Sequence, residues 1–241
     1  MRRKESALTL VILLRHAHST ANHSGILAGR TEGVHLSPLG RAQARKLSTR
    51  LGEIPLKSLR TSPLERCTET LHPWLRRREL SDSTVNPPLL VDHDLAEVDY
   101  GLWSGIKLRT LSRDPLWKTV QEHPSKVTFP QGESLLAMQK RAMKSVDAGL
   151  SLRGKGHVLL MSHGDVVKSI IAGALGMHLD EFQRIVIDPA SVSILDYSGS
   201  RPRVLLLNDS RSRLDSSIFA QRGKKALVGG GAGTTQKKGV S

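Results

Sequence analysis

Two stretches of this chain, far apart in sequence, share one pattern of apolar and polar positions. In each, a short run of branched apolar residues ends at a histidine and is followed by small residues: 9–14 leads to His16, and 158–161 leads to His163. Such runs are typical of strands buried on both faces of a parallel sheet. Ligands of these sheets bind beyond the carboxyl ends of the strands. We therefore expect both histidines at one site, although 147 positions (163 minus 16) separate them.

Capping residues and periodicity divide the rest of the chain into alternating helices and strands. The predicted elements are, in order, a polar loop at 18–36, a helix from Pro38, a strand at 57–61, a helix whose capping box begins at Ser62, an irregular acidic stretch at 87–102, a helix at 132–150, a helix at 165–175 closed by Gly176, and edge strands at 191–197 and 204–207. The apolar face of the helix from Pro38 is expected at Leu39, Ala42, Leu47 and Leu51. This alternation indicates an α/β fold.

Charge and composition narrow the class of partner. The chain has 241 residues and a formal net charge of +14, which first suggests nucleic acid. However, from Arg201 onward nine basic side chains stand against Asp209 and Asp215, so this segment carries +7 of the charge. Aromatic residues make up 3% of the chain, too few for rows of stacking platforms. We therefore expect no nucleic-acid partner, one domain at 1–208, and a basic tail at 209–241 that is disordered.

Cysteine usage and the apolar runs bear on the compartment. Cys67 is the only cysteine, so no intrachain disulfide can form and a reducing compartment is expected. The basic residues at 2–4 and the apolar run at 7–14 imitate a signal peptide, but the run has eight residues and no cleavage site follows it. No apolar run approaches the roughly 18 residues of a membrane span. We expect a cytoplasmic protein without a membrane partner.

The residues at the predicted strand ends fit the chemistry of a phosphate monoester. Phosphoryl transfer needs cations that hold the phosphoryl oxygens, and arginine has the fork geometry for it. Arg15 ends the first strand, Arg66 lies in the first turn of a helix, and His163 precedes another helix, whose N–H groups favour anions. A neutral imidazole can attack phosphorus, and His16 is the candidate. A histidine without a chemical role is commoner, but that reading does not explain two histidines and two arginines placed alike.

Five short motifs, in order along the chain, resemble those of a known family. They are Arg15, His16 and Ala17 with Ser19 and Asn22; Thr61 to Leu64 with Arg66; Glu97 with Tyr100, Gly101, Trp103 and Gly105; Gly132, Glu133 and Ser134; and Ser162, His163 and Gly164. They resemble the RHG, SSPLxR, ExxYGxWxG, GES and SHG elements of the histidine phosphatase superfamily, which includes cofactor-dependent phosphoglycerate mutases. The resemblance covers residues 9–208 and implies a three-layer α/β/α sandwich with a mostly parallel central sheet.

The resemblance also implies a phosphohistidine mechanism. His16 would attack the phosphoryl group, and Glu97 would protonate the leaving oxygen and then take a proton from water. Composition alone would assign Glu97 to a solvated acidic patch, and only the family pattern selects it. The residues implied in holding the phosphoryl oxygens, or the loop around them, are Arg15, Asn22, Arg66, His163 and Gly164.

Some positions depart from the family pattern or extend it. Ala17 replaces the usual glycine, and His18 stands where many relatives have an acid, so His18 is a candidate substrate contact. Arg30 lies in a loop that runs near the site in relatives; it is a second candidate contact, with a solvated loop arginine as an equal alternative. We interpret Cys67 as a buried, inert thiol.

Phosphatase and mutase share these motifs. Gly101 and Gly132 are only 31 positions apart (132 minus 101), without the long insertion of classical mutases, which favours a phosphomonoesterase for a small phosphorylated metabolite. The first alternative is a phosphoglycerate-mutase-like phosphomutase, because the pattern also resembles an actinobacterial branch labelled phosphomutase. The second is a catalytically weak phosphate-binding regulatory protein. The ten histidines lack metal-ligand spacing, and no metal or cofactor is expected. The substrate and the oligomeric state stay open, a homodimer included.

Overall fold

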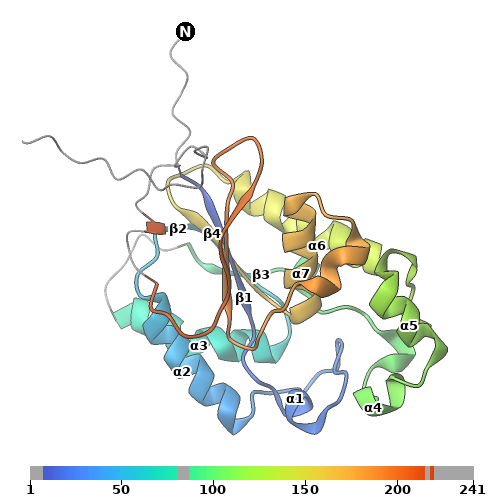
Figure 1. Ribbon diagram of the computed structural model, residues 1–241. Helices are drawn as coiled ribbons and strands as arrows, with labels where there is room; N and C mark the ends of the chain where they lie inside the picture. The colour runs from blue at the N-terminus through green and yellow to red at the C-terminus, as the bar shows by residue number, and fades with distance from the viewer. Residues whose placement is uncertain (1–7, 81–86, 215–217, 220–241) are drawn as a thin grey trace, which may run out of the picture.

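Six strands form one sheet in the computed structural model, which describes residues 8–80, 87–214 and 218–219 (Figure 1). The strands are β1 (Leu10–Arg15), β2 (Leu56–Thr61), β3 (Leu89–Val91), β4 (His157–Ser162), β5 (Val192–Asp196) and β6 (Arg203–Asp209). Their order across the sheet is β3-β2-β4-β1-β5-β6, and the pairs from β3 to β1 are parallel. The expected α/β fold with a mostly parallel sheet is confirmed.

The two strands that lead to histidines are direct neighbours. β1 pairs with β4 in parallel, and the last residues of the two strands, Arg15 and Ser162, lie opposite each other in the register. His16 continues this ladder, because its N–H donates to the Ser162 carbonyl at 2.9 Å. The two histidines therefore leave the sheet at the same edge, as the sequence pattern predicts.

The two late strands differ in position. β6 lies at the sheet edge as expected, but β5 lies between β1 and β6 and is antiparallel to both, so the expectation of two edge strands is wrong. Val192, Ile194 and Leu195 of β5 are fully buried. A short apolar run is compatible with either position, and the pairing partner decides between them.

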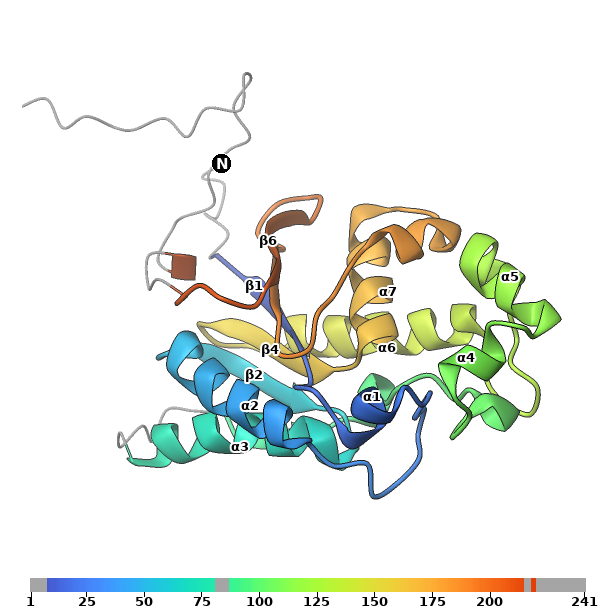
Figure 2. The same ribbon diagram turned by 60° about the horizontal axis from the view of Figure 1, so that its bottom comes forward.

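Helices cover both faces of the sheet and complete three layers (Figures 1 and 2). α2 (Pro38–Leu51) and α3 (Glu65–Leu80) pack on one face, and α6 (Leu135–Leu150) and α7 (Gly164–Leu175) on the other. Alternate side chains of β1 enter the two cores: Val11 and Leu13 face α6 and α7, whereas Ile12 and Leu14 face α2 and α3. The expected α/β/α sandwich is confirmed.

Local chemistry sets the helix ends, in part differently from the prediction. α2 begins at Pro38 with Ser37 as N-cap, and α7 ends at Gly176, which has φ 67°. α3 begins at Glu65 rather than at Ser62, whose hydroxyl oxygen lies 2.7 Å from His163 Nε2. α6 begins at Leu135 rather than at Gly132. A Cβ on Gly132 would lie 2.3 Å from the carbonyl oxygen of a neighbouring loop, so glycine is required there for a close backbone approach.

The apolar face of α2 is rotated from the predicted one. Leu47 and Leu51 are buried as predicted, but Leu39 is 56% exposed. Ala44, rather than Ala42, lies in the core. Leu39 is in the first turn of the helix, directly after the polar loop.

Short helices surround the carboxyl ends of the strands. α1 (Thr20–Ser24) interrupts the segment predicted as loop, and α4 (Leu108–Leu111) and α5 (Pro115–Glu122) follow the motif at 97–105. Short 3₁₀ helices occur at His93–Leu95, Gly101–Trp103, Pro124–Lys126 and Leu179–Arg184. In Figures 1 and 2 α4 and α5 lie at one side of the molecule, and α1 lies between them and α2.

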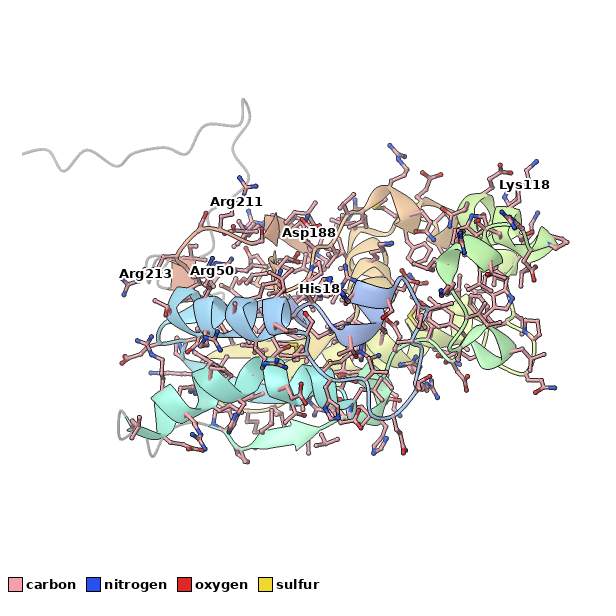
Figure 3. The ribbon with its side chains drawn as sticks, turned by 90° about the horizontal axis from the view of Figure 1, so that it is seen from below. His18, Arg50, Lys118, Asp188, Arg211 and Arg213 are labelled. Carbon is pink, nitrogen blue, oxygen red and sulfur yellow. The ribbon has the colours of Figure 1, made fainter. Side chains whose placement is uncertain are left out.

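The chain remains part of the fold after residue 208. Asp209 ends β6, and Leu214 and Phe219 are buried in the core on the α2 and α3 side. The Arg50 side chain donates to the carbonyls of Asp209 and Ser212, at 2.8 Å each, and lies beside this segment in Figure 3. The remainder of the expected tail, 215–217 and 220–241, lies outside the described residues. Among the described residues no helix is long and apolar enough to cross a membrane.

Candidate active site

A cavity of about 190 Å³ lies at the carboxyl ends of β1 and β4. The candidates that line it are Arg15, His16, Asn22, Arg66, Glu97 and Gly164. His163 lies directly behind the cavity, with its ring centroid 5.1 Å from that of His16. Residues from four separate parts of the sequence are therefore brought to one place by the parallel sheet.

His16 is held with one ring nitrogen bound and the other free. Its side chain is buried, and Nδ1 lies 2.7 Å from the Ala17 carbonyl oxygen. Because a carbonyl only accepts, Nδ1 carries the hydrogen, and a neutral ring then has its lone pair on Nε2. Burial first, and then Arg66 and Arg15, lower the pKa of His16 well below its ordinary value. His16 is thus a neutral imidazole with an available Nε2.

Arg15 and Arg66 are each anchored by one nitrogen and leave others without a partner. Arg15 Nη1 donates to the Ile187 carbonyl, and Arg66 Nη2 donates to the Gly29 carbonyl at 2.8 Å. Arg15 Nε, Arg66 Nε and Arg66 Nη1 are buried and have no hydrogen-bond partner. An unpaired buried donor costs about 1–3 kcal/mol, and more for a charged group. An anion in the cavity would satisfy all three donors.

Ser62 fixes the proton on His163. Ser62 Oγ lies 2.7 Å from His163 Nε2 and also accepts the Leu64 N–H at 3.3 Å. The hydroxyl hydrogen needs an acceptor, and Nε2 supplies it, so Nδ1 of a neutral His163 carries the ring hydrogen. His163 is fully buried, and burial and the nearby arginines lower its pKa well below the ordinary value. Nδ1 has no hydrogen-bond partner and lies 3.9 Å from Glu97 Oε2, as a donor available to the cavity.

Glu97 is a buried acid and not part of a solvated patch. Its side chain is 12% exposed. Burial first, and then the negative charge of Asp165, raise the pKa of Glu97 to about 7. Near neutral pH its carboxyl group is therefore present in both protonation states, which suits a group that gives a proton and then takes one.

A partly buried pair of charged side chains, Arg141 and Glu133, holds the main chain at Glu97. Arg141 donates to the carbonyls of Asp94 (2.8 Å), Ala96 (2.6 Å) and Glu97 (3.0 Å). The Glu133 carboxylate accepts from Arg141 Nε at 3.0 Å and thereby orients the guanidinium. Glu133 of the Gly132, Glu133, Ser134 motif thus positions Glu97 indirectly, through Arg141.

The remaining sequence candidates divide into two kinds. Asn22 lines the cavity, and its Oδ1 accepts from the Ser19 N–H at 3.0 Å, which fixes the loop after β1. Arg30 does not line the cavity; it donates to the Glu97 carbonyl and to Glu133, both at 2.9 Å. His18 lies outside the cavity lining as well, because its Nδ1 pairs with Ser37 Oγ at 2.8 Å where the chain passes from α1 to α2 (Figure 3).

Asp165 and Tyr100 line the cavity and were not among the predicted site residues. The Tyr100 hydroxyl donates to Asp165 Oδ2 at 2.8 Å, and Lys168 lies 3.3 Å from Asp165 Oδ1. Asp165 follows the second histidine motif as an acid in the first turn of a helix, a signal that the sequence did contain. The carbonyls that anchor the arginines had no signal, because main-chain groups are the same in every residue.

The thiol of Cys67 is inert in this environment. It is fully buried, and burial raises its pKa to about 12. Because the thiolate is the nucleophile, such a group does not react at neutral pH. The expected burial of Cys67 is confirmed.

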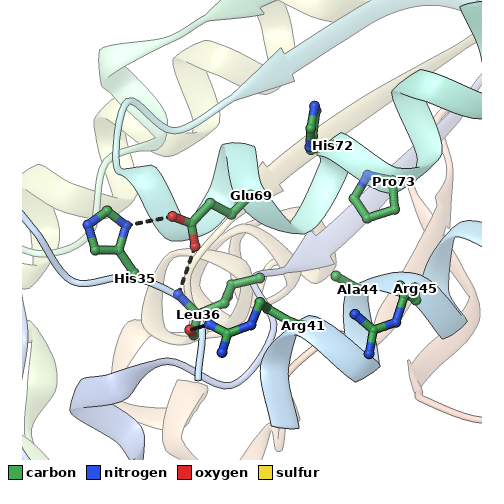
Figure 4. A pocket seen from close by; sticks show the side chains of 8 residues that line it. All are labelled: His35, Leu36, Arg41, Ala44, Arg45, Glu69, His72 and Pro73. Atoms are coloured by element: carbon green, nitrogen blue, oxygen red, sulfur yellow. Dashed lines mark hydrogen bonds and ion pairs between the residues drawn. The ribbon is translucent and has the colours of Figure 1, made fainter. Parts of the chain in front are cut away.

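A larger hollow, of about 410 Å³, lies between α2 and α3 (Figure 4). Glu69 accepts there from His35 and from the Leu36 N–H (2.8 Å), and Arg41 donates to the Leu36 carbonyl (2.8 Å). None of the described side chains that line this hollow is a buried polar group without a partner. Size alone therefore does not identify the site, and the unpaired donors and shifted pKa values lie in the smaller cavity.

Comparisons with known proteins agree with this geometry. Residues 11–210 match the family model of the histidine phosphatase superfamily (branch 1). Phosphoserine phosphatase 1 of Hydrogenobacter thermophilus is 28% identical over 82% of this chain and 91% of its own length, and the probable phosphoglycerate mutase GpmB of Erwinia tasmaniensis is 26% identical over 79% and 86%. The solved structure of YhfR from Bacillus stearothermophilus superposes with a TM-score of 0.73 at 25% identity and covers 83% of this chain and 97% of that one.

Proposed function

The chain belongs to the histidine phosphatase superfamily, branch 1, and from this membership we propose that it is a phosphomonoesterase that works through a phosphohistidine at His16. Phosphatase or mutase chemistry on small phosphorylated metabolites is what its homologues have in common. The observation that carries the proposal is a neutral imidazole with a free Nε2 beside three unpaired arginine donors.

The first half-reaction transfers the phosphoryl group to the enzyme. His16 Nε2 attacks phosphorus, an N–P bond forms, and the P–O bond to the alcohol breaks. Arg15, Arg66 and the Nδ1 hydrogen of His163 hold the phosphoryl oxygens, and Glu97 gives its proton to the leaving oxygen. The N–H groups at the start of α7, where Gly164 lies, add positive potential.

The second half-reaction returns the enzyme to its starting state. Glu97, now a carboxylate, takes a proton from a water molecule whose oxygen attacks phosphorus. The N–P bond breaks, inorganic phosphate leaves, and His16 regains its lone pair. One water is consumed for each monoester, and the alcohol and phosphate are the products. The raised pKa of Glu97, about 7, supports both of its roles.

Hydrolysis is favoured over mutase chemistry by the short connection between Gly101 and Gly132. This stretch holds only α4, α5 and two single 3₁₀ turns. A mutase must keep water from the phosphoenzyme, and a short connection covers less of the site. Incubation with 3-phosphoglycerate and a trace of 2,3-bisphosphoglycerate separates the two: we expect free phosphate to form faster than the phosphoglycerate isomer. The reverse ratio would make the protein a phosphomutase.

Three finer predictions belong to this proposal. An affiliation with an actinobacterial branch labelled phosphomutase would favour the mutase alternative. A cytoplasmic location fits a small phosphorylated metabolite as substrate. A homodimer is compatible with a site that is built from one chain, and sedimentation would decide it.

Turnover of 4-nitrophenyl phosphate tests the proposed function. We expect hydrolysis by the wild-type chain and no turnover by His16→Ala, which lacks the attacking nitrogen. His72→Ala is the matched control, because His72 is exposed on α3 and does not line the cavity. Rapid quenching should trap a phosphoenzyme that is stable in alkali and labile in acid, absent from His16→Ala. Full activity of His16→Ala would refute the proposal.

A further inference from the structure

Four apolar side chains also line the cavity: Ile26, Leu27 and Ala28 of the segment after α1, and Leu108 at the start of α4. Leu108 keeps 41% of its surface exposed, so it lies toward solvent. These side chains form a wall against which the alcohol part of a phosphomonoester would rest.

This apolar wall is built before any substrate binds. Its two segments are joined by main-chain hydrogen bonds: the Leu27 N–H donates to the Ile106 carbonyl (2.9 Å), and the Leu108 N–H donates to the Gly25 carbonyl (2.9 Å). An isolated antiparallel bridge pairs Ile26 with Lys107. Because the main chain of both segments is already fixed, ligand binding costs less backbone ordering there.

The charges of the cavity suit one anionic group and no second one. Among the described residues that line it, only Arg15 and Arg66 are cationic, and their free donors would be used by the phosphoryl group. Asp165 is negative and already paired with Tyr100 and Lys168. Arg30, the cation expected near the substrate, is bound to the Glu97 carbonyl and Glu133. A carboxylate on the alcohol part would lose water without gaining a counter-charge.

We propose, on the basis of the proposed function, that the preferred substrates are phosphomonoesters of small apolar alcohols without a second anionic group. A cavity of about 190 Å³ is below the usual 300–1,000 Å³ range for drug-sized ligands and suits an alcohol of about one ring. Substrates such as phosphoserine and phosphoglycerate carry the extra carboxylate and are disfavoured here. The apolar wall and the lack of a third cation among the described residues that line the cavity together determine the preference.

Three phosphorylated primary alcohols test this preference at similar leaving-group chemistry: benzyl phosphate, glycerol 1-phosphate and 3-phosphoglycerate. We expect kcat/KM to fall in that order, by about 10-fold or more from the first to the last. Equal values, or a preference for 3-phosphoglycerate, would overturn the substrate proposal and leave the phosphatase intact. If the protein hydrolysed neither these three esters nor 4-nitrophenyl phosphate, the proposed function itself would be overturned.

Two matched variants show whether the wall is responsible. Leu108→Arg places a cation in the wall, and we expect it to lower kcat/KM for benzyl phosphate and to raise kcat/KM for 3-phosphoglycerate, each by about 10-fold. Leu136→Arg adds the same charge at an exposed leucine of α6 outside the cavity and should change neither value. If Leu108→Arg does not fold, Leu108→Ser should still lower kcat/KM for benzyl phosphate more than kcat/KM for 3-phosphoglycerate. An unchanged ratio in the folded variant would contradict the proposal.

Discussion

Two side chains of the cavity have proton affinities shifted in opposite directions by the same burial. His16 is kept neutral because burial and two arginines disfavour its charged form, whereas Glu97 is kept partly protonated because burial and Asp165 disfavour its carboxylate. Phosphoryl transfer to nitrogen with protonation of the leaving oxygen requires a neutral imidazole as nucleophile and a protonated carboxyl group as acid. The pair is therefore poised for the same half-reaction near neutral pH.

The pKa of Glu97 predicts the alkaline limb of the pH profile. With a pKa of about 7, the carboxyl group is protonated below this pH and loses its proton above it, so kcat/KM for benzyl phosphate should fall as pH rises through 7. Glu97→Gln should abolish this limb and lower kcat/KM by about 10²–10⁴-fold. The titration of the substrate phosphate remains in both proteins and serves as the internal reference. A limb near pH 7 that persists unchanged in Glu97→Gln would assign the titration to another group.

We predict that Ser62 is a positioning residue: its hydroxyl keeps the ring hydrogen of His163 on Nδ1. Ser62→Ala removes the hydrogen that occupies Nε2, so the ring hydrogen can move from Nδ1 to Nε2 and the donor to the phosphoryl group is lost. We expect kcat/KM to fall about 10- to 100-fold, the range known for residues that orient metal-binding histidines. Nitrogen NMR of the His163 ring should report the change of tautomer.

The control for Ser62 is another buried serine hydroxyl. Ser48 donates to the Pro73 carbonyl at 3.1 Å between α2 and α3, far from the cavity lining. Ser48→Ala should cost about 1 kcal/mol of stability, similar to Ser62→Ala, without changing kcat/KM. If Ser62→Ala and Ser48→Ala lost activity equally, the role of Ser62 would be structural only.

At the scale of elements, the sequence predicts what periodicity and capping control and misses what pairing and main-chain contacts control. The strands before His16 and His163 and the cap at Gly176 follow from local patterns, and they are confirmed. The inner position of β5 depends on its neighbour in the sheet, which no local pattern shows. Arg30 carries the right chemistry for a substrate contact, but Glu133, a residue distant in sequence, directs it to the Glu97 carbonyl instead.

Arg141 of α6 holds the main chain at 94–97, so replacing it should displace the Glu97 carboxyl group. Arg141→Met leaves the carbonyls of Asp94 and Ala96 without their donor and the Glu97 carbonyl with Arg30 alone, so we expect the variant to lose about 1–3 kcal/mol of stability. Turnover of benzyl phosphate should fall more than that of 4-nitrophenyl phosphate, because nitrophenolate leaves without a proton. Lys140→Met, at an exposed position of the same helix, is the control for lost charge. Equal loss for both substrates would indicate general misfolding.

At the scale of the whole molecule, the two ends of the sheet have separate tasks. The cavity occupies the carboxyl ends of the parallel strands, where loops from distant sequence meet. The amino end of β4 is covered by the chain after β6: the ring of Phe219 lies 5.5 Å from that of His157, the first residue of β4, and the Leu214 N–H donates to the Arg50 carbonyl at 3.0 Å. Changes at this end should therefore affect stability more than catalysis.

Two truncations test this separation and the limit of the folded domain. A chain that ends after Asp209 loses the buried Leu214 and Phe219 and the Ser212 carbonyl that accepts from Arg50, so we expect its free energy of unfolding to fall by about 2–5 kcal/mol. A chain that ends after Phe219 keeps these contacts and should retain the full Tm. Both should have the wild-type kcat/KM at a temperature where they are folded, because neither loses a residue of the cavity.

If the chain that ends after Asp209 melts like the wild type, the packing of Leu214 and Phe219 contributes nothing to stability, and the folded domain ends at β6. If instead the chain that ends after Phe219 loses activity while it keeps its Tm, the basic residues beyond it act on the substrate or its approach, and the domain boundary is not a functional one.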